Sequence, residues 1–255
     1  MIKARSIIAF VTQLLAVTVL ATGATVSAAD FEPHSAHYDV RIKMFKGSMV
    51  TGLQAEKGVF TGTSEIRARG LARLAAKGTI ENRSQFRLSN DAVQPLAFEG
   101  NDSISKRKKK ATLDFDWEAL RVTGLTSQKN SGELVENQVN DPVEDGTHDA
   151  VSLQYALMHD LQKDQLRDQY ILIDGSERKV INITRREPVT LRVPFGEFEA
   201  VPVEHQVEGS SRTTIFWLAE ELNFLPVKIE QRRKGKRLMK AELGDYRPTE
   251  ELSSL

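Results

Sequence analysis

Alternation of apolar and polar residues with a period of two is the feature that most constrains the fold of this chain. In residues 37–45, Tyr38, Val40, Ile42 and Met44 fall on one face, and Asp39, Arg41 and Lys43 fall on the other. Because successive side chains of a β-strand point to opposite faces, this segment is predicted to be a half-buried strand. The same reasoning predicts strands over residues 49–55, 59–67, 84–88, 111–117, 170–173, 179–184, 189–193, 201–207, 213–218, 227–233 and 238–243.

Turn-forming residue pairs separate many of these segments. They are Lys46-Gly47, Lys57-Gly58, Asn90-Asp91, Asp174-Gly175, Phe195-Gly196, Gly209-Ser210 and Lys234-Gly235. Short strands divided this regularly are typical of an antiparallel sheet. Residues 127–147 are rich in Asn, Glu, Asp and Gly, and are predicted to form a weak strand followed by a surface loop.

One segment changes to a helical period. Ala150, Leu153, Leu157 and Leu161 keep helical spacing, and Thr147 or Asp149 can accept a backbone N–H at the helix N-terminus. The pattern therefore predicts one helix over about residues 147–161. The fold class expected is mainly β: a curved antiparallel sheet or open β-barrel, with this helix packed on or in it. Residues 30–255 are predicted to form a single β-rich domain with a frayed tail after residue 246, and a division near residues 127–147 is the alternative.

The first 29 residues have the order of a cleavable signal peptide. Lys3 and Arg5 precede an apolar stretch, and small residues follow it, so cleavage is expected near Ala28 or Ala29. The alternative is an uncleaved membrane anchor, which Gln13 and the polar end of the stretch disfavour. The sequence therefore predicts export, and a periplasmic location if the cell is Gram-negative.

Composition excludes several classes of chemistry. The chain has no cysteine, which excludes disulfides, thiolate catalysis, Cys-ligated metal sites and a lipid anchor at the processing site. Removal of residues 1–29 takes away Lys3 and Arg5 and no acid, which leaves a net charge of −2. A nearly neutral exported chain is not expected to bind nucleic acid. No apolar stretch after residue 29 is long enough to span a membrane, so no mature transmembrane segment is predicted.

Catalytic motifs are missing from the sequence. No G-x-S-x-G or H-E-x-x-H occurs. A metal could be held by His34 and His37 with Glu32, or by His148 with Asp145 and Asp149, but solvated or structural side chains are the favoured interpretation. Asp114 and Asp116 lie on one strand face, where a polar outer surface is favoured over a glycosidase pair, and residues 141–146 lack the spacing of a calcium loop. The chain is therefore predicted not to be an enzyme, and no metal or cofactor is expected.

Two basic clusters occupy residues 106–110 and 232–237. Their cations are candidates for contact with anionic headgroups or with a protein partner, namely Lys108, Lys109, Arg232, Arg233 and Arg237. The alternative is defensive, because lysines at strand ends and edges prevent edge-to-edge pairing of sheets.

The C-terminal stretch from Thr213 to Glu230 contains Trp217 and the pair Pro226-Val227, and a basic hairpin follows it. This stretch, residues 145–155 and the opening 31–38 resemble the bacterial exported family known as domain of unknown function 3108. That resemblance brings no activity with it. It implies a fold similar to the open β-barrels of periplasmic lipoprotein carriers, and so a concave apolar groove.

The leading hypothesis is non-enzymatic binding of a lipid, an acyl chain or a lipoprotein segment in that groove. Trp117, Tyr155, Phe195 and Trp217 are the candidate lining residues, with core packing as the alternative for each. The second hypothesis is a component of an envelope complex that docks a partner through its basic hairpin tips or a strand edge. The third is an enzyme that acts on envelope glycan or lipid.

Overall fold

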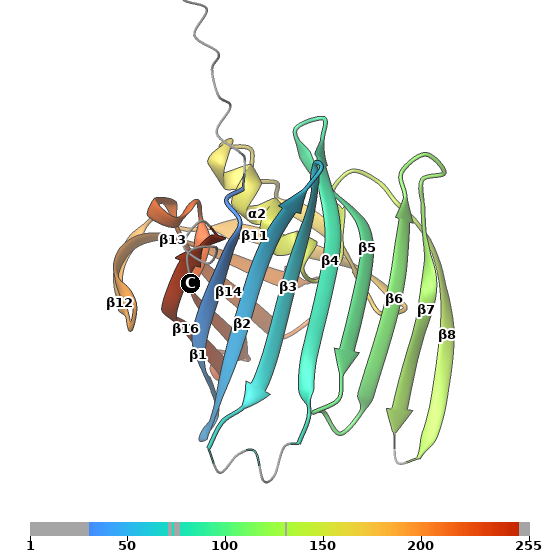
Figure 1. Ribbon diagram of the computed structural model, residues 1–255, viewed down its shortest axis with the longest axis horizontal. Coiled ribbons are helices and arrows are strands. Elements are labelled where there is room, and N and C mark those ends of the chain that lie inside the picture. Colours follow the sequence, from blue (N-terminus) through green and yellow to red (C-terminus); the bar gives the residue numbers. More distant parts are fainter. Residues whose placement is uncertain (1–30, 71–72, 74–76, 131, 250–255) are drawn as a thin grey trace, which may run out of the picture. The chain divides into compact units, whose positions relative to one another are not determined.

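The computed structural model describes residues 31–70, 73, 77–130 and 132–249 (Figure 1). The predicted signal peptide and its cleavage site lie outside these residues. The first half holds β1 (His34–Ile42), β2 (Phe45–Glu56), β3 (Val59–Ala68), β4 (Thr79–Ser89), β5 (Ala92–Asp102), β6 (Lys108–Asp116), β7 (Arg121–Asn130) and β8 (Glu133–Pro142). The second half holds β9 (Thr147–His148), α2 (Ser152–Gln162), β10 (Gln169–Asp174), β11 (Glu177–Arg185), β12 (Val189–Val193), β13 (Gly196–Val207), β14 (Arg212–Ala219), the 3₁₀ turn η1 (Glu220–Leu222), β15 (Leu225–Arg233) and β16 (Lys236–Pro248).

The strands form one large sheet that is not closed into a barrel. Their order is β8-β7-β6-β5-β4-β3-β2-β1-β16-β15-β14-β13-β11-β10-β9, and β12 pairs with β13 off this path. Pairing is antiparallel except for the short contact of β9 with β10. Strands β13–β16 pass behind β1–β4 in Figure 1, so the sheet curves round a shared interior. The predicted curved antiparallel sheet with one helix is confirmed.

Helix α2 covers one end of the concave face. Gln165, just after the helix, donates a hydrogen bond to the carbonyl of Asp91 in the β4–β5 turn, and Gln162 donates to the carbonyl of Asn223 beside η1. The helix thus connects the two halves of the sheet. It begins at Ser152, later than predicted, because Thr147 belongs to β9 and Asp149 caps the helix by accepting the N–H groups of Val151 and Ser152.

The core under the helix is aromatic and filled. Phe86 of β4 is fully buried, stacks on Tyr155 of α2 with ring centroids 4.9 Å apart, and stacks on Phe60 of β3 at 5.5 Å. Phe31 meets all three rings edge-on. Gly62 of β3 makes room for the helix, because a Cβ there would lie 2.6 Å from the Tyr155 ring. Among the described residues, the hollow beside Phe31, Leu53 and Met158 of α2 holds only about 10 Å³, which is too small for a ligand.

Three strands, β5, β7 and β8, were not predicted or were predicted only in part. Strand β5 contains Pro95, which normally argues against a strand; here Pro95 pairs with Phe86 at a register shift, where its missing N–H removes no regular ladder bond. Strand β7 was not predicted, and residues 127–147 hold the end of β7, all of β8 and the first residue of β9 rather than a weak strand and a loop. In β8 only Val139 is fully buried, so its hydrophobic pattern is faint.

The first predicted turn was also misplaced. The chain reverses at Lys43-Met44, and Lys46 and Gly47 lie inside β2. Lys43 adopts a left-handed φ of 55°, a conformation that turn signals usually assign to Gly or Asn. In the described ranges, no helix is long and apolar enough to cross a membrane.

Candidate functional site

The end of the concave face opposite α2 is not covered by the helix. Strand pairing aligns Val40 of β1 with Gly47 of β2 and Ala68 of β3, and aligns Ile66 of β3 with Ile80 of β4. Val40 is buried, so this row belongs to the inner face of the sheet. Apolar side chains therefore continue along the inner face to the β1–β2 turn, beyond the reach of the helix.

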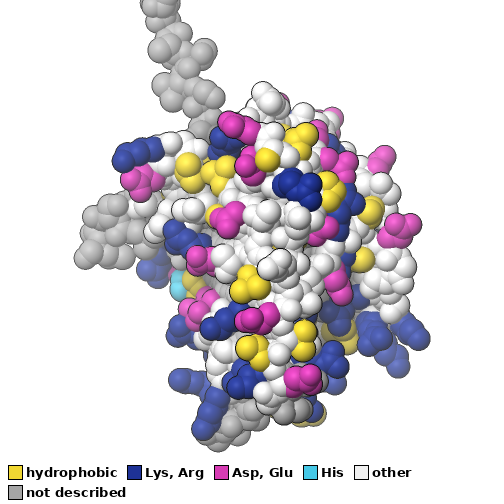
Figure 2. Space-filling view, turned by 90° about the vertical axis from the view of Figure 1, so that its right-hand side faces the viewer, with side chains coloured by type: hydrophobic (Ala, Val, Ile, Leu, Met, Phe, Trp, Pro, Cys, Tyr) yellow, Lys and Arg dark blue, Asp and Glu magenta, His cyan; other side chains and the backbone are white. Residues whose placement is uncertain are grey.

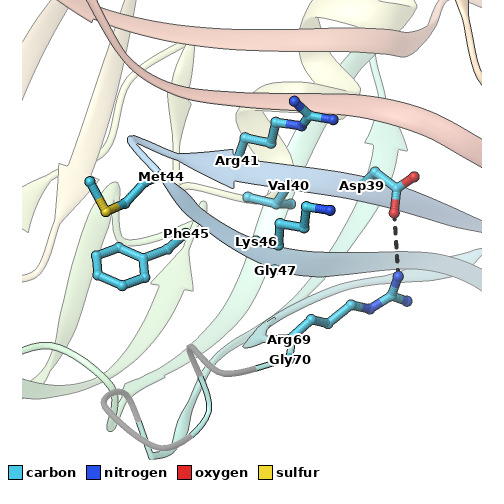
Figure 3. A pocket seen from close by; sticks show the side chains of 9 residues that line it. All are labelled: Asp39, Val40, Arg41, Met44, Phe45, Lys46, Gly47, Arg69 and Gly70. Carbon is cyan, nitrogen blue, oxygen red and sulfur yellow. Dashed lines mark hydrogen bonds and ion pairs between the residues drawn. The ribbon is translucent and has the colours of Figure 1, made fainter.

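A hollow of about 400 Å³ lies at this place, and we call it the hairpin hollow. Its lining is mostly apolar and comprises Val40, Ile42, Phe45, Lys46, Gly47, Ile66, Arg67, Ala68, Ile80, Ile104 and Ser105. A second hollow of about 550 Å³ adjoins it and shares Val40, Phe45, Lys46 and Gly47 with it (Figure 3). Both volumes fall in the range of small-ligand sites, which is about 300–1,000 Å³.

Gly47 allows β2 and β3 to pack closely at the base of the hairpin hollow. A Cβ at this position would lie 2.8 Å from the carbonyl oxygen of Arg67 and 3.7 Å from the Cβ of Val40. Any side chain there would push β2 away from β3 or fill the hollow. The glycine that sequence analysis assigned to a turn therefore serves close packing of strands.

Cations surround the mouth of the hollow. Arg41, Lys46 and Arg69 line the adjoining hollow, and Arg69 contacts Asp39 with Nη1 to Oδ1 at 3.3 Å (Figure 3). Arg67 pairs with Glu65. Ion pairs this exposed contribute little to stability, about 0–1 kcal/mol each. Of these cations, Lys46 and Arg67 line the hairpin hollow itself.

The four predicted lining residues are not brought together by the structure. Tyr155 is buried in the aromatic core and donates a hydrogen bond to the carbonyl of Gly52. Trp117 donates to the carbonyl of Pro95 at 2.7 Å, near the end of the sheet that holds α2. Phe195 is 39% exposed on the β12–β13 turn and stacks on Phe198. Trp217 has the amine of Lys228 4.3 Å from its ring centre.

The predicted cationic residues lie on two segments. Lys108 and Lys109 are exposed at the start of β6. Arg233 and Arg237 are exposed at the β15–β16 turn, whereas Arg232 is half-buried and donates two hydrogen bonds to the buried carboxylate of Glu230. The signal that sequence analysis missed is Met44-Phe45, an apolar pair between Lys43 and Lys46 at a turn.

The predicted metal candidates do not converge. His34 is buried, its Nδ1 lies 2.8 Å from the carbonyl oxygen of Glu32, and His37 is exposed on the opposite face of β1. Asp149 is occupied as the helix cap, and Asp114 and Asp116 are exposed on β6. Within residues 31–70, 73, 77–130 and 132–249, no group of three or more His, Cys, Asp or Glu side chains is arranged to hold a metal ion.

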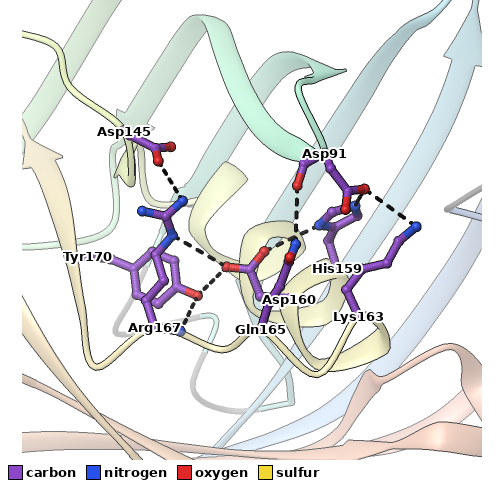
Figure 4. A network of polar contacts seen from close by, with 8 residues as sticks. All are labelled: Asp91, Asp145, His159, Asp160, Lys163, Gln165, Arg167 and Tyr170. Atoms are coloured by element: carbon purple, nitrogen blue, oxygen red, sulfur yellow. Dashed lines mark hydrogen bonds and ion pairs between the residues drawn. The ribbon is translucent and has the colours of Figure 1, made fainter.

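A polar network pins the C-terminal end of α2 (Figure 4). Asp160 accepts a hydrogen bond of 2.5 Å from the Tyr170 hydroxyl, and its other oxygen lies 3.3 Å from Nδ1 of His159. Nε2 of His159 lies 3.5 Å from the exposed carboxylate of Asp91, and Arg167 donates to Asp145. Burial is the main cause that raises the pKa of Tyr170 far above its usual value, so its hydroxyl stays a donor. These contacts tie the helix to β10 and to the β4–β5 turn.

Acid should destabilise the fold through His148. This side chain is 2% exposed beside Tyr170, and burial lowers the pKa of its imidazole to about 4. The unfolded chain, with a pKa near 6.5, takes up the proton first, so the stabilisation is complete above about pH 6.5 and is lost as the pH falls toward 4. We expect the loss to reach about 3 kcal/mol, measured by urea denaturation across this pH range.

The control for that measurement is a pair of matched variants. His148→Gln should reduce the dependence of the unfolding free energy on pH, and the remainder is expected from His205, whose pKa burial also lowers to about 4. His37→Gln, at an exposed position, is the matched histidine-to-glutamine control. Equal slopes in wild type and His148→Gln would contradict the assignment.

The comparisons with known proteins bear on the family alone. Residues 33–241 match the family model described as "Protein of unknown function (DUF3108)". No curated protein matches the chain. The matched segment spans β1 through most of β16, and the chain belongs to this family, as its sequence resemblance predicted.

Proposed function

We propose that this DUF3108 protein is exported and binds a lipid or acyl chain, without chemically changing it, in the hairpin hollow. The observation that carries the proposal is an apolar hollow of about 400 Å³ at the uncovered end of the concave face, with Lys46 and Arg67 among its lining. Burial of an acyl chain against Val40, Ile66 and Ile80 supplies the binding free energy, at about 25 cal/mol per Å² of apolar surface removed from water. The cations select an anionic headgroup.

The lining supports binding rather than catalysis. Ser105 supplies its one side-chain hydroxyl, and no carboxylate or imidazole lines the hollow to activate it. The buried titratable groups His159, Asp160 and Tyr170 belong to the network at the opposite end, where they hold α2. Export remains part of the proposal and depends on residues 1–29, whose order is that of a signal peptide.

Filling the hollow should abolish ligand binding. Ile66 lies on the inner face between Met49 and Ile80, so Ile66→Trp places an indole where the acyl chain is proposed to lie. We expect the affinity for a fluorescent fatty acid to fall by about tenfold or more, as measured by titration. Protein purified from the cell envelope should also release a lipid that mass spectrometry of a solvent extract identifies.

Leu120→Trp provides the matched control. Leu120 is 57% exposed on the β6–β7 turn, at the opposite end of the sheet. Its substitution by tryptophan adds the same indole there. This variant should bind the fatty acid as wild type does. If wild type binds no fatty acid and releases no lipid, or if both variants bind equally well, the proposal is wrong.

A further inference from the structure

Strand pairing gathers several turns of the sheet at one end. Ile42 pairs with Phe45 on β2 and with Met239 on β16, so the β1–β2 and β15–β16 hairpins are neighbours. Ile80 of β4 pairs with Asp102, and Lys108 pairs with Lys129, so the β5–β6 and β7–β8 turns lie at the same end. We call this the basic end.

Exposed cations crowd the basic end. They are Lys43, Lys46, Arg69, Arg73, Lys77, Lys106, Arg107, Lys108, Lys109, Lys110, Lys129, Arg212, Arg233, Lys234, Lys236 and Arg237. Two of them have carboxylate partners among the described residues: Arg69 contacts Asp39, and Arg237 lies 3.7 Å from Glu230. Of the acids at these turns, Asp102 accepts the N–H groups of Ile104 and Ser105, while Glu133 and Glu208 are exposed but far fewer than the cations. The end therefore carries a large uncompensated positive charge.

The opposite end is richer in acids, and several of them have cationic partners: Lys57 lies beside Glu56, Lys163 beside Asp91, Arg178 contacts Glu144 and Arg167 contacts Asp145. Its exposed carboxylates are Glu56, Asp91, Glu118, Glu144, Asp145, Glu220 and Glu221, in the turns near α2 and η1. In Figure 2 the dark blue side chains are most concentrated in the lower part of the molecule, and magenta side chains are frequent in the upper part. Although the formal net charge of the chain is zero, its positive charge is thus concentrated at one end of the strands.

Large apolar side chains project from the middle of the basic end. Met44 is 87% exposed, Phe45 is 50% exposed and Ile42 is 46% exposed, all on the β1–β2 hairpin. Figure 3 shows the Met44 and Phe45 side chains extending away from the body of the hairpin. Exposed apolar groups inside a ring of cations match the interface of a lipid bilayer, which is apolar below a layer of phosphates.

We propose that the basic end docks on the surface of an anionic lipid bilayer, with Met44 and Phe45 inserted among the lipids and the surrounding cations held at the phosphate level. Charge complementarity argues for an anionic partner, and the apolar tip argues for a bilayer. Nucleic acid or a soluble polyanion offers nothing apolar at the centre of its phosphates. Docking opens the mouth of the hairpin hollow onto the membrane, but it does not depend on the hollow being filled.

Vesicle sedimentation tests the docking directly. The chain without residues 1–29 is mixed with vesicles of phosphatidylcholine alone or of phosphatidylcholine with phosphatidylglycerol, at low and at physiological salt. We expect binding to the phosphatidylglycerol vesicles alone, weakened by salt. Charge reversal by Lys108→Glu, Lys109→Glu and Lys236→Glu together should reduce partitioning by about tenfold or more. Met44→Ser with Phe45→Ser should reduce it as well, while the salt dependence persists.

Matched variants at the opposite end serve as controls. Lys57→Glu and Leu120→Ser alter exposed residues on the β2–β3 and β6–β7 turns and should bind vesicles as wild type does. Three outcomes would overturn the proposal. They are equal binding to neutral vesicles, no binding to any vesicle, and binding like wild type by the variant with Met44→Ser and Phe45→Ser. Inorganic phosphate that displaces the protein better than chloride at the same ionic strength would indicate a soluble phosphate ligand instead.

The proposal of ligand binding in the hollow and the proposal of membrane docking can be refuted independently. Ile66→Trp leaves the cations and the tip in place, so it should still bind phosphatidylglycerol vesicles after losing the fatty acid. Vesicle binding by a wild-type protein that takes up no fatty acid would leave docking standing and refute only ligand binding.

Discussion

Phe86→Ala should lower the free energy of unfolding by about 3–5 kcal/mol, which is the cost of removing a fully buried aromatic side chain. Phe86 has no exposed surface and stacks between Tyr155 of α2 and Phe60 of β3. Its loss leaves a cavity that the neighbouring strand and helix cannot move in to fill, because Phe31 already packs edge-on against the remaining rings. Unfolding in urea, followed by far-UV circular dichroism, measures the effect.

Phe45→Ala is the matched control for this substitution. Phe45 is half exposed at the β1–β2 turn, and removal of its ring should change the unfolding free energy by less than about 0.5 kcal/mol. A loss at Phe45 as large as that at Phe86 would mean that the hairpin stabilises the fold as much as the aromatic cluster under the helix does, which would contradict this assignment.

Asp149→Ala should destabilise the protein by about 3–4 kcal/mol, combining a lost helix cap with buried donors left unpaired. The Asp149 carboxylate is fully buried and accepts the N–H groups of Val151 and Ser152 at 2.8 and 2.9 Å. It also accepts the hydroxyl of Ser84 at 2.6 Å, which joins the start of α2 to β4. Alanine leaves all of these donors in the interior without an acceptor.

Asp149→Asn separates the hydrogen bonds from the charge. Asparagine keeps one oxygen in a side chain of the same shape, so it should cost clearly less than alanine, about 1–2 kcal/mol. Burial is the largest influence on this carboxyl and raises its pKa, whereas the hydrogen bonds oppose that shift. Equal losses for the two variants, by urea denaturation, would show that the hydrogen bonds to Asp149 do not hold the helix.

The residues that stabilise the fold and the residues with proposed functions lie at opposite ends of the sheet. The end with α2 contains the aromatic core, the Asp149 cap and the network around Asp160, and its interior is full. The basic end retains a hollow, an exposed apolar hairpin and, among the described residues, many cations without a carboxylate partner. Large apolar side chains that stay exposed on a folded chain are the natural candidates for contact with a ligand or a membrane.

Much of the fold was predictable because the physical signal was local. Alternation along β1 and β6 and the helical stripe of α2 depend on one face being buried, and that pattern is visible residue by residue. Strand β5 was missed because it contains Pro95, which is tolerated here beside a bulge at Leu96 of the same strand. The turn at Lys43-Met44 was missed because neither residue is a usual turn former, and Gly47 next to it offered a stronger signal.

The candidate site was less predictable than the fold. Aromatic residues were the sequence candidates for a ligand groove, yet Tyr155 completes the core and Trp217 lies against Lys228. The residues that line the hairpin hollow are ordinary aliphatic strand residues such as Ile66 and Ile80. Their alternation looks the same whether the space above them is filled by a helix or left open.

The sequence by itself determined that this chain forms an antiparallel β-sheet with one helix, because each half-buried strand and the helix display their buried face in their own periodicity. Its family was recognisable in the same local patterns. Only the tertiary structure decided where the helix lies, which end of the sheet stays uncovered, and that the cations of Lys108 and Lys236 share that end. These properties depend on pairings between strands far apart in the chain, and a net charge near zero concealed the concentration of positive charge at one end of the strands.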